Sequence, residues 1–117
     1  AEAAGATAVV ELPYSVHYPV TFNNIALTKA MLPSLQKSAG EENVLLVPAF
    51  TSSEDFSFYA QKVPGLFFRL GGMPKGKDPK NAEPHHTPGF FIDDNSFKLG
   101  VIAFCNLVFD YGEINKK

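Results

Sequence analysis

The alternation of apolar and polar residues predicts three strands. Residues 6–12 alternate with a period of two, as a strand does when one of its faces is covered. Pro13 follows them and has no backbone donor, so the end of this strand should leave its sheet. Two later runs, 43–50 (NVLLVPAF) and 66–72 (LFFRLGG), are short and largely apolar. Such runs are typical of strands covered on both faces, as in a parallel sheet.

The stretch 24–39 predicts a helix. Its apolar residues recur three to four positions apart, and Gly40 follows where a helix C-cap is expected. Asn23 or Asn24 can cap its start. Pro33 stands inside the pattern, so either the helix bends there or the stretch forms two shorter helices.

Two further stretches predict helices. The first covers residues 53–62 and has Ser53 as its candidate N-cap. The second begins with Asp94 or Asn95 as its N-cap and ends at Gly112. This last helix is apolar on almost every side, so we expect it to be buried or to require another part of the protein as its partner.

Residues 73–88 predict a loop. They hold four prolines among several charged residues, so no regular element should persist there. A loop of this length inside a domain is usually either functional or disordered. The elements therefore follow one another as strand, helix, strand, helix, strand, loop and helix, and this order is typical of an α/β fold.

The composition excludes several classes of protein. The 117 residues include 12 acidic and 10 basic side chains, a net charge of −2, which gives no electrostatic reason to expect nucleic acid or an anionic membrane as partner. No apolar run approaches the ~20 residues of a transmembrane helix. The single cysteine, Cys105, excludes an internally disulfide-bonded scaffold, and it is compatible with the cytosol without requiring it. Its apolar neighbours predict an inert core thiol.

His85 and His86 are the first candidates for chemistry. Imidazole binds zinc and titrates near neutral pH, and Pro88 with the apolar residues after it should hold the exit of the loop. The alternative is that both rings are simply solvated. A zinc site takes three or four protein ligands, and the sequence contains no HxH, HExxH or CxxC motif to supply them.

Glu54 and Asp55 are the second candidates. They follow a predicted buried strand, and ligands of open parallel sheets gather beyond the carboxyl ends of the strands. The alternative is that both carboxylates only interact with the N-terminus of a helix. Nearby serines are not placed in a nucleophile motif, because no G-x-S-x-G sequence is present.

Several short motifs occur in a recognisable order. Residues 18–24 read Y-P-V-T-F-N-N, 54–57 read E-D-F-S, 64–71 contain P-G and L-G, and 86–88 read H-T-P. This series resembles the C-terminal part of a family of metal-dependent amidohydrolases and peptidases, which includes hippurate hydrolase, N-acyl-amino-acid amidohydrolases and the plant enzymes that cleave auxin–amino-acid conjugates. Phe91 departs from the pattern, since an acidic residue is common there. Further matches are Phe90, the pair Asp93 and Asp94, and Gly100.

The resemblance implies a fold and a reaction. Members have a three-layer α/β catalytic domain, interrupted by a smaller lid domain that usually mediates dimerisation. They bind two divalent ions, commonly zinc or manganese, and a glutamate base helps metal-bound water to attack the amide of an N-acyl amino acid or small peptide. By resemblance His86 is a metal ligand. His85, Glu54 and Asp55 lie near the site, and Asn23 matches an asparagine at the domain junction.

The resemblance also implies a division of the chain. Residues 1–20 match the closing strand of the lid, and 21–117 match the C-terminal part of the catalytic domain. The general base and the other metal ligands are expected upstream of Ala1, so the chain reads as roughly the last third of such an enzyme and should be inactive alone. The intact protein should be a homodimer. The alternative function is a non-catalytic module that keeps the fold and binds a protein partner.

Overall fold

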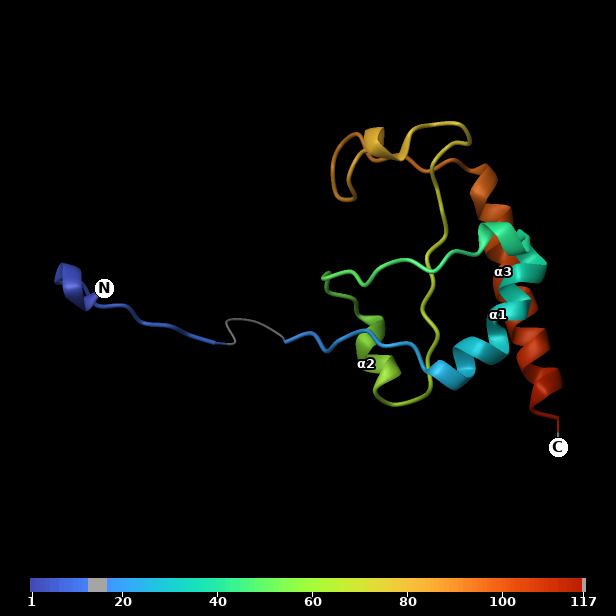
Figure 1. Ribbon diagram of the computed structural model, residues 1–117, viewed down its shortest axis with the longest axis horizontal. Coiled ribbons are helices and arrows are strands. Elements are labelled where there is room, and N and C mark those ends of the chain that lie inside the picture. Colours follow the sequence, from blue (N-terminus) through green and yellow to red (C-terminus); the bar gives the residue numbers. More distant parts are fainter. Residues whose placement is uncertain (13–16, 117) are drawn as a thin grey trace.

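The computed structural model describes residues 1–12 and 17–116, and its regular elements are helices (Figure 1). The two long helices are α1 (Ile25–Ala39) and α3 (Asn95–Ile114), and a short helix α2 (Phe56–Ala60) lies between them in sequence. Three single turns of 3₁₀ helix complete the list: η1 (Glu2–Ala4), η2 (Glu41–Asn43) and η3 (Pro79–Asn81). The last of these turns corrects the expectation that no element forms in residues 73–88.

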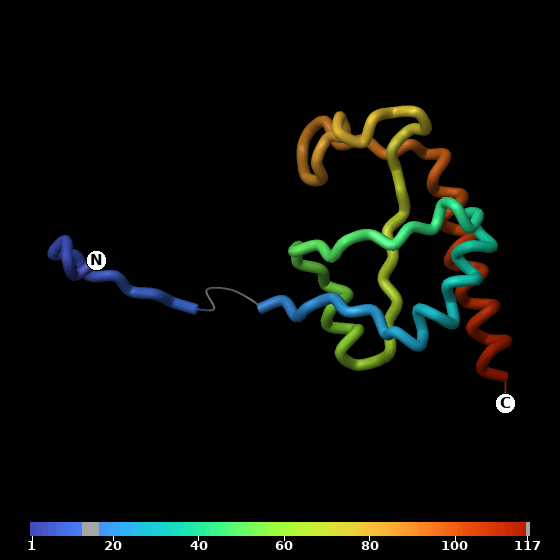
Figure 2. The backbone as a smooth tube through the Cα atoms, in the orientation of Figure 1, coloured from blue at the N-terminus to red at the C-terminus, as the bar shows by residue number. Residues whose placement is uncertain are grey.

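The three predicted strands do not form in the described part of the chain. Residues 6–12, 44–50 and 66–72 run as extended backbone without a ladder of hydrogen bonds (Figure 2). The guanidinium of Arg69 lies 3.9 Å from the centre of the Phe50 ring, so a side-chain contact joins the last two segments. A strand exists only where a neighbour accepts its backbone hydrogen bonds. The α/β class is therefore not seen in this structure, although the extended segments lie where strands were predicted.

Helix α1 confirms the predicted caps. The side chain of Asn24 accepts a hydrogen bond from the backbone of Leu27 at 2.9 Å, and Gly40 ends the helix with a positive φ of 87°. Pro33 lies inside one continuous helix, which bends along its length (Figure 1). Of the two outcomes left open by the sequence, the bent helix is the one found.

The other two helices begin or end away from the predicted residues. Helix α2 starts at Phe56 rather than near Ser53, and Asp55 is the residue before it. Helix α3 starts as predicted at Asn95, but it continues through Gly112 to Ile114. Its first turn is held by Asp93, whose carboxylate accepts a hydrogen bond from the backbone of Asn95 at 3.0 Å.

The core lies between α1 and α3. Met31 on α1 and Ala103 on α3 are buried, at 3% and 4% exposure. Gly100 is buried as well, and a Cβ atom at this position would lie 3.0 Å from Cδ2 of Leu70. Small residues on α3 therefore let α1 and the segment 66–72 approach it closely.

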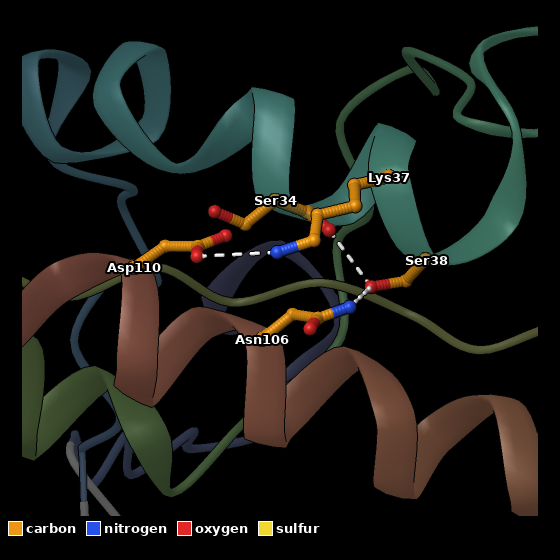
Figure 3. Close-up of polar contacts among 5 residues, drawn as sticks. All are labelled: Ser34, Lys37, Ser38, Asn106 and Asp110. Atoms are coloured by element: carbon orange, nitrogen blue, oxygen red, sulfur yellow. Dashed lines mark hydrogen bonds and ion pairs between the residues drawn. The ribbon is translucent and has the colours of Figure 1, made fainter.

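Polar side chains fix the register of α1 against α3 (Figure 3). Ser38 donates from its hydroxyl to the Ser34 carbonyl at 2.7 Å, and Asn106 donates from its amide to the Ser38 hydroxyl at 2.9 Å. One turn further along, Lys37 pairs with Asp110 at 3.4 Å. The Ser38–Ser34 bond lies within α1, whereas the Asn106–Ser38 bond and the Lys37–Asp110 pair cross to α3. Because these two crossing contacts form only in one alignment of the helices, they select that alignment over neighbouring ones.

Asp110 should make the α1–α3 contact dependent on pH. The hydroxyl of Ser34, and next Lys37, hold the pKa of Asp110 below its ordinary value of 3.8. A carboxyl whose pKa is lowered by folding stabilises the folded state above its unfolded pKa, and this contribution is lost as the pH falls through the lower, folded pKa. In the full-length protein that contains this chain, Asp110→Asn should therefore lower the melting temperature near pH 7, and the difference from wild type should shrink below about pH 4.

Thermal denaturation of both proteins across this pH range tests the prediction. Glu11→Gln is the matched control, because Glu11 lies in the exposed N-terminal segment. A difference that stays constant from pH 7 to pH 3 would contradict the assignment of Asp110.

The chain exposes far more surface than a closed domain. Its accessible surface is 10,193 Å², whereas a compact monomer of this mass exposes about 6,200 Å². A row of apolar residues along α3, here called the α3 apolar stripe, contributes to the excess at 52–69% exposure: Phe97, Val101, Phe104 and Val108. The last helix is thus only partly buried: Ala103 packs against α1 and the Phe104 ring lies 5.3 Å from that of Phe68, but most of the α3 apolar stripe stays exposed.

Cys105 lies on the same helix and is exposed, so its predicted place in the core is wrong. Among the helices of the described residues, none has the length and apolar character needed to cross a membrane.

Candidate functional site

The loop that carries the two adjacent histidines is closed at its base. The carbonyl of Gly72 accepts a hydrogen bond from the backbone of Asp93 at 2.8 Å, and the side chain of Ile92 packs against Gly72. Residues 73–92 therefore leave and return at one point of the structure, next to the first turn of α3 (Figure 1). Closure at both ends limits the positions that the histidines can take.

His85 and His86 are held in different ways. The ring of His85 lies 4.6 Å from the ring of Phe90, centre to centre. The backbone of His86 is in the left-handed conformation, with a positive φ of 65°. Among the described residues, it is the one residue other than glycine that has a positive φ. Thr87 stabilises the turn by donating from its hydroxyl to the carbonyl of Pro84 at 2.8 Å. His85 is thus packed on its own loop, whereas His86 occupies the costly left-handed conformation.

Glu54 and Asp55 form a turn that leads into α2. The carboxylate of Glu54 is half-buried and accepts a hydrogen bond from the backbone of Phe56 at 3.4 Å. Hydrogen bonding to the Asp55 carboxylate, and next its negative charge, raise the pKa of the Tyr18 phenol above its ordinary value of 10.0. The two carboxylates therefore interact with the start of a helix and with the segment before α1.

An open pocket of about 410 Å³ lies beside this turn. Glu54 and Asp55 are its charged residues, and the remainder of its wall is mainly aromatic. Ser57, from the E-D-F-S motif, is fully buried, and its hydroxyl has no hydrogen-bond partner among the described residues. The wall is completed by Phe56, Tyr59, Leu66, Phe67, Phe68 and Phe104.

Asn23 lies at the junction between the N-terminal segment and α1. Its side-chain amide makes two hydrogen bonds with the backbone of Phe67, accepting from the N–H at 2.7 Å and donating to the carbonyl at 2.8 Å. The backbone of Asn24 adds a third bond, to the carbonyl of Gly65, at 2.9 Å. Asn23 therefore touches the segment after α2, not the histidine loop.

The structure does not bring the candidate residues together. The loop 73–92 and helix α2 lie on opposite sides of the extended segment 44–50 (Figure 1). Within residues 1–12 and 17–116, no three His, Cys, Asp or Glu side chains are close enough to hold a metal ion. The described residues thus do not by themselves fit a metal ion.

Tyr18 and Asp93 are residues with a structural role at the site that the sequence analysis did not identify. Tyr18 opens the Y-P-V-T-F-N-N motif, more than thirty positions before Asp55, and nothing local signals that the two side chains interact. Asp93 was noted as one of an acidic pair, but its closure of the loop on Gly72 depends on the fold.

Comparison with known proteins identifies the family. The model of peptidase family M20/M25/M40 matches residues 4–110. Thermostable carboxypeptidase 2 of Saccharolobus solfataricus is 32% identical over 92% of this chain, and the putative amidohydrolase YhaA of Bacillus subtilis is 26% identical over 89% of it. The IAA-amino acid hydrolase ILR1-like 6 of Arabidopsis thaliana is 29% identical over 71% of it.

These relatives are much longer than the chain, which spans 26% of the length of the first two and 18% of the third. The comparison with solved structures gave no significant match. The match to the family model covers nearly the whole sequence, and it includes both the E-D-F-S and the H-T-P motifs. The chain belongs to the M20/M25/M40 family of hydrolases.

Proposed function

We propose that this chain is the C-terminal part of a metal-dependent hydrolase that cleaves the amide bond of N-acyl amino acids or small peptides. The relatives are named as carboxypeptidases, amidohydrolases and IAA-amino acid hydrolases, and the proposed substrates share the amide bond that such names imply. The intact protein in this proposal is the full-length enzyme that contains these 117 residues.

The observation that carries the proposal is the conformation of His86. A non-glycine residue at positive φ costs about 1 kcal/mol or more, and such residues cluster at functional sites. His86 adopts this conformation within the H-T-P motif, in a loop whose ends meet at Gly72 and Asp93. We assign its imidazole as one ligand of a divalent ion, which would polarise the substrate carbonyl and lower the pKa of bound water. The other ligands and the general base belong to the upstream polypeptide.

The exposed surface supports the upstream part as the partner of this chain. The α3 apolar stripe and residues 45–50 are open to solvent, with Leu46 fully exposed at 102%, and segment 66–72 is half-buried. The backbone of both segments is extended without a ladder to a neighbouring strand, and the amide of Asn23 occupies the backbone groups of Phe67. We propose that the upstream chain completes an α/β sheet here and covers α3.

The division of the chain follows from the same proposal. Residues 1–20 would close the lid domain and 21–117 would complete the catalytic domain, with dimerisation through the lid. In the described residues the N-terminal segment 1–12 is exposed throughout. This exposure fits a segment that packs in a separate domain.

Metal removal and return test the proposed activity. The intact protein should hydrolyse at least one member of a panel of N-acyl amino acids and dipeptides. Dialysis against a chelator should abolish the activity, and Zn²⁺ or Mn²⁺ should restore it. Hydrolysis that persists after complete removal of metal, or its absence across the whole panel with metal present, would contradict the proposal.

A further inference from the structure

Three contacts tie the segment before α1 to the Glu54–Asp55 turn and the chain after α2. The ring of Tyr18 lies 5.6 Å from the ring of Phe58, and the Asp55 carboxylate lies near enough to raise the pKa of the Tyr18 hydroxyl. Five residues later, Asn23 binds both backbone groups of Phe67. These residues are distant in sequence, so the contacts join two segments that local structure would leave independent.

The bonds of Asn23 replace a missing strand neighbour. In a β-ladder, a backbone N–H and a carbonyl of one residue are both bound by the adjacent strand. For Phe67 the two bonds come instead from the oxygen and the nitrogen of one amide side chain, at 2.7 and 2.8 Å. No other side chain offers a donor and an acceptor in this planar arrangement except glutamine.

The position of Phe67 is passed on to the turn by aromatic packing. The rings of Phe67 and Phe56 lie 5.5 Å apart, and the Phe56 ring also covers Gly65, where a Cβ atom would come within 2.8 Å of it. Phe56 is the residue directly after Asp55, and its backbone bonds the carboxylate of Glu54. A shift of Phe67 would therefore move the ring that immediately follows both carboxylates.

We propose that Asn23 is a positioning residue: its amide fixes the backbone at Phe67 and, through Phe56, holds the Glu54–Asp55 turn in place for the reaction. Asn23 acts through the packed segment and touches no reacting group. Its effect on turnover rests on the function proposed above, whereas its effect on the turn does not.

Two variants of the intact protein test the two hydrogen bonds between Asn23 and Phe67. Asn23→Ala removes both of them. Asn23→Asp keeps the size and the acceptor for the N–H of Phe67, but it places an oxygen against the Phe67 carbonyl and removes the donated bond. Asn43→Ala is the matched control, since the Asn43 amide also donates to a backbone carbonyl at 2.8 Å, but its partners, Ala39 and the carboxylate of Glu42, are close in sequence.

The titration of Tyr18 reports the position of the turn without any assay of activity. With ¹³C label at the tyrosine Cζ, and the Tyr18 signal assigned by its loss in Tyr18→Phe, the phenol pKa is read directly. Asp55→Asn gives the value without the carboxylate. Asn23→Ala and Asn23→Asp should both move the pKa of Tyr18 down toward that value, and Asn43→Ala should leave it unchanged.

Steady-state kinetics report the consequence for the reaction. Both Asn23 variants should lower kcat about tenfold, since small misplacements of groups at a site are costly, and should change KM by less than about twofold. An unchanged Tyr18 titration in both variants would overturn the positioning of the turn. A shifted titration with wild-type kcat would overturn its role in turnover. A shifted titration in a protein whose wild type hydrolyses nothing would support the positioning of the turn and refute the proposed function.

Discussion

His86→Asn is expected to lower kcat/KM of the intact protein by more than about 100-fold, because mutating residues that merely support a metal ligand already costs about 10- to 100-fold. Asparagine is the informative substitution at this position. His86 has a φ of 65°, and asparagine tolerates the left-handed region better than alanine does. The variant thus keeps the backbone of the loop while it removes the imidazole.

The metal content of the same variant separates a ligand from a structural residue. If His86 binds a divalent ion, His86→Asn should retain clearly less metal than wild type after gel filtration, with an unchanged melting temperature of the metal-free protein. Kinetics and elemental analysis on one preparation provide both values.

His85→Asn is the matched control for this prediction. The ring of His85 packs on Phe90 within its own loop, so its removal should disturb the loop less and reduce kcat/KM by less than about tenfold. Equal losses of metal and activity in the two variants, or wild-type values in His86→Asn, would show that the wrong residue has been assigned.

The 117-residue chain expressed alone is expected to self-associate and to unfold without a sharp transition. It exposes 10,193 Å², roughly 4,000 Å² more than a closed domain of its mass, and an excess of this size matches the area buried in obligate interfaces. Sedimentation velocity should show species heavier than a monomer. Urea denaturation should give a broad, shallow curve, because little apolar surface remains to be exposed.

The α3 apolar stripe provides the variant for this experiment. Val101 and Val108 lie seven residues apart, on one face of the helix, with exposures of 65% and 69%. The double variant Val101→Ser and Val108→Ser should reduce self-association of the isolated chain and should destabilise the intact protein, where the stripe is covered. Glu2→Ser and Lys29→Ser, at exposed positions outside the stripe, form the control. A monomer of the wild-type chain with a cooperative transition would favour the alternative of an autonomous module.

Local signals in the sequence were sufficient for the two long helices. Asn24 caps α1 and Gly40 ends it, as their side chain and backbone freedom predict. The start of α3 at Asn95 was also predicted, but the side chain of Asp94 makes no capping bond and the carboxylate of Asp93 bonds the backbone of Asn95 instead. The end of α3 was not predicted correctly. Gly112 lies inside the helix, because a long helix tolerates one glycine when the residues on either side are helical.

The strands could not be confirmed because they depend on residues far away in sequence. The runs 44–50 and 66–72 have the composition of buried strands, and they are extended, but their ladder needs partners outside the described residues. Composition alone also placed Cys105 in the core, whereas the structure exposes it, because apolar neighbours in sequence do not fix which side of a helix is covered.

The candidate site was predictable as a set of motifs but not as a geometry. The H-T-P motif pointed to His86, and its positive φ is a property that no local pattern announces. Asn23 matched a family asparagine without a role, and its two bonds to Phe67 span 44 residues. Such long-range contacts follow from packing, which single-sequence patterns do not encode.

The most direct test of the central claim is a crystal structure of the intact protein grown with Zn²⁺ and measured at the zinc absorption edge. We predict an anomalous peak about 2.0–2.1 Å from a ring nitrogen of His86, the usual zinc–histidine distance, with the remaining ligands supplied by residues upstream of Ala1. A zinc site whose ligands do not include His86, with this ring directed into solvent, would contradict the account.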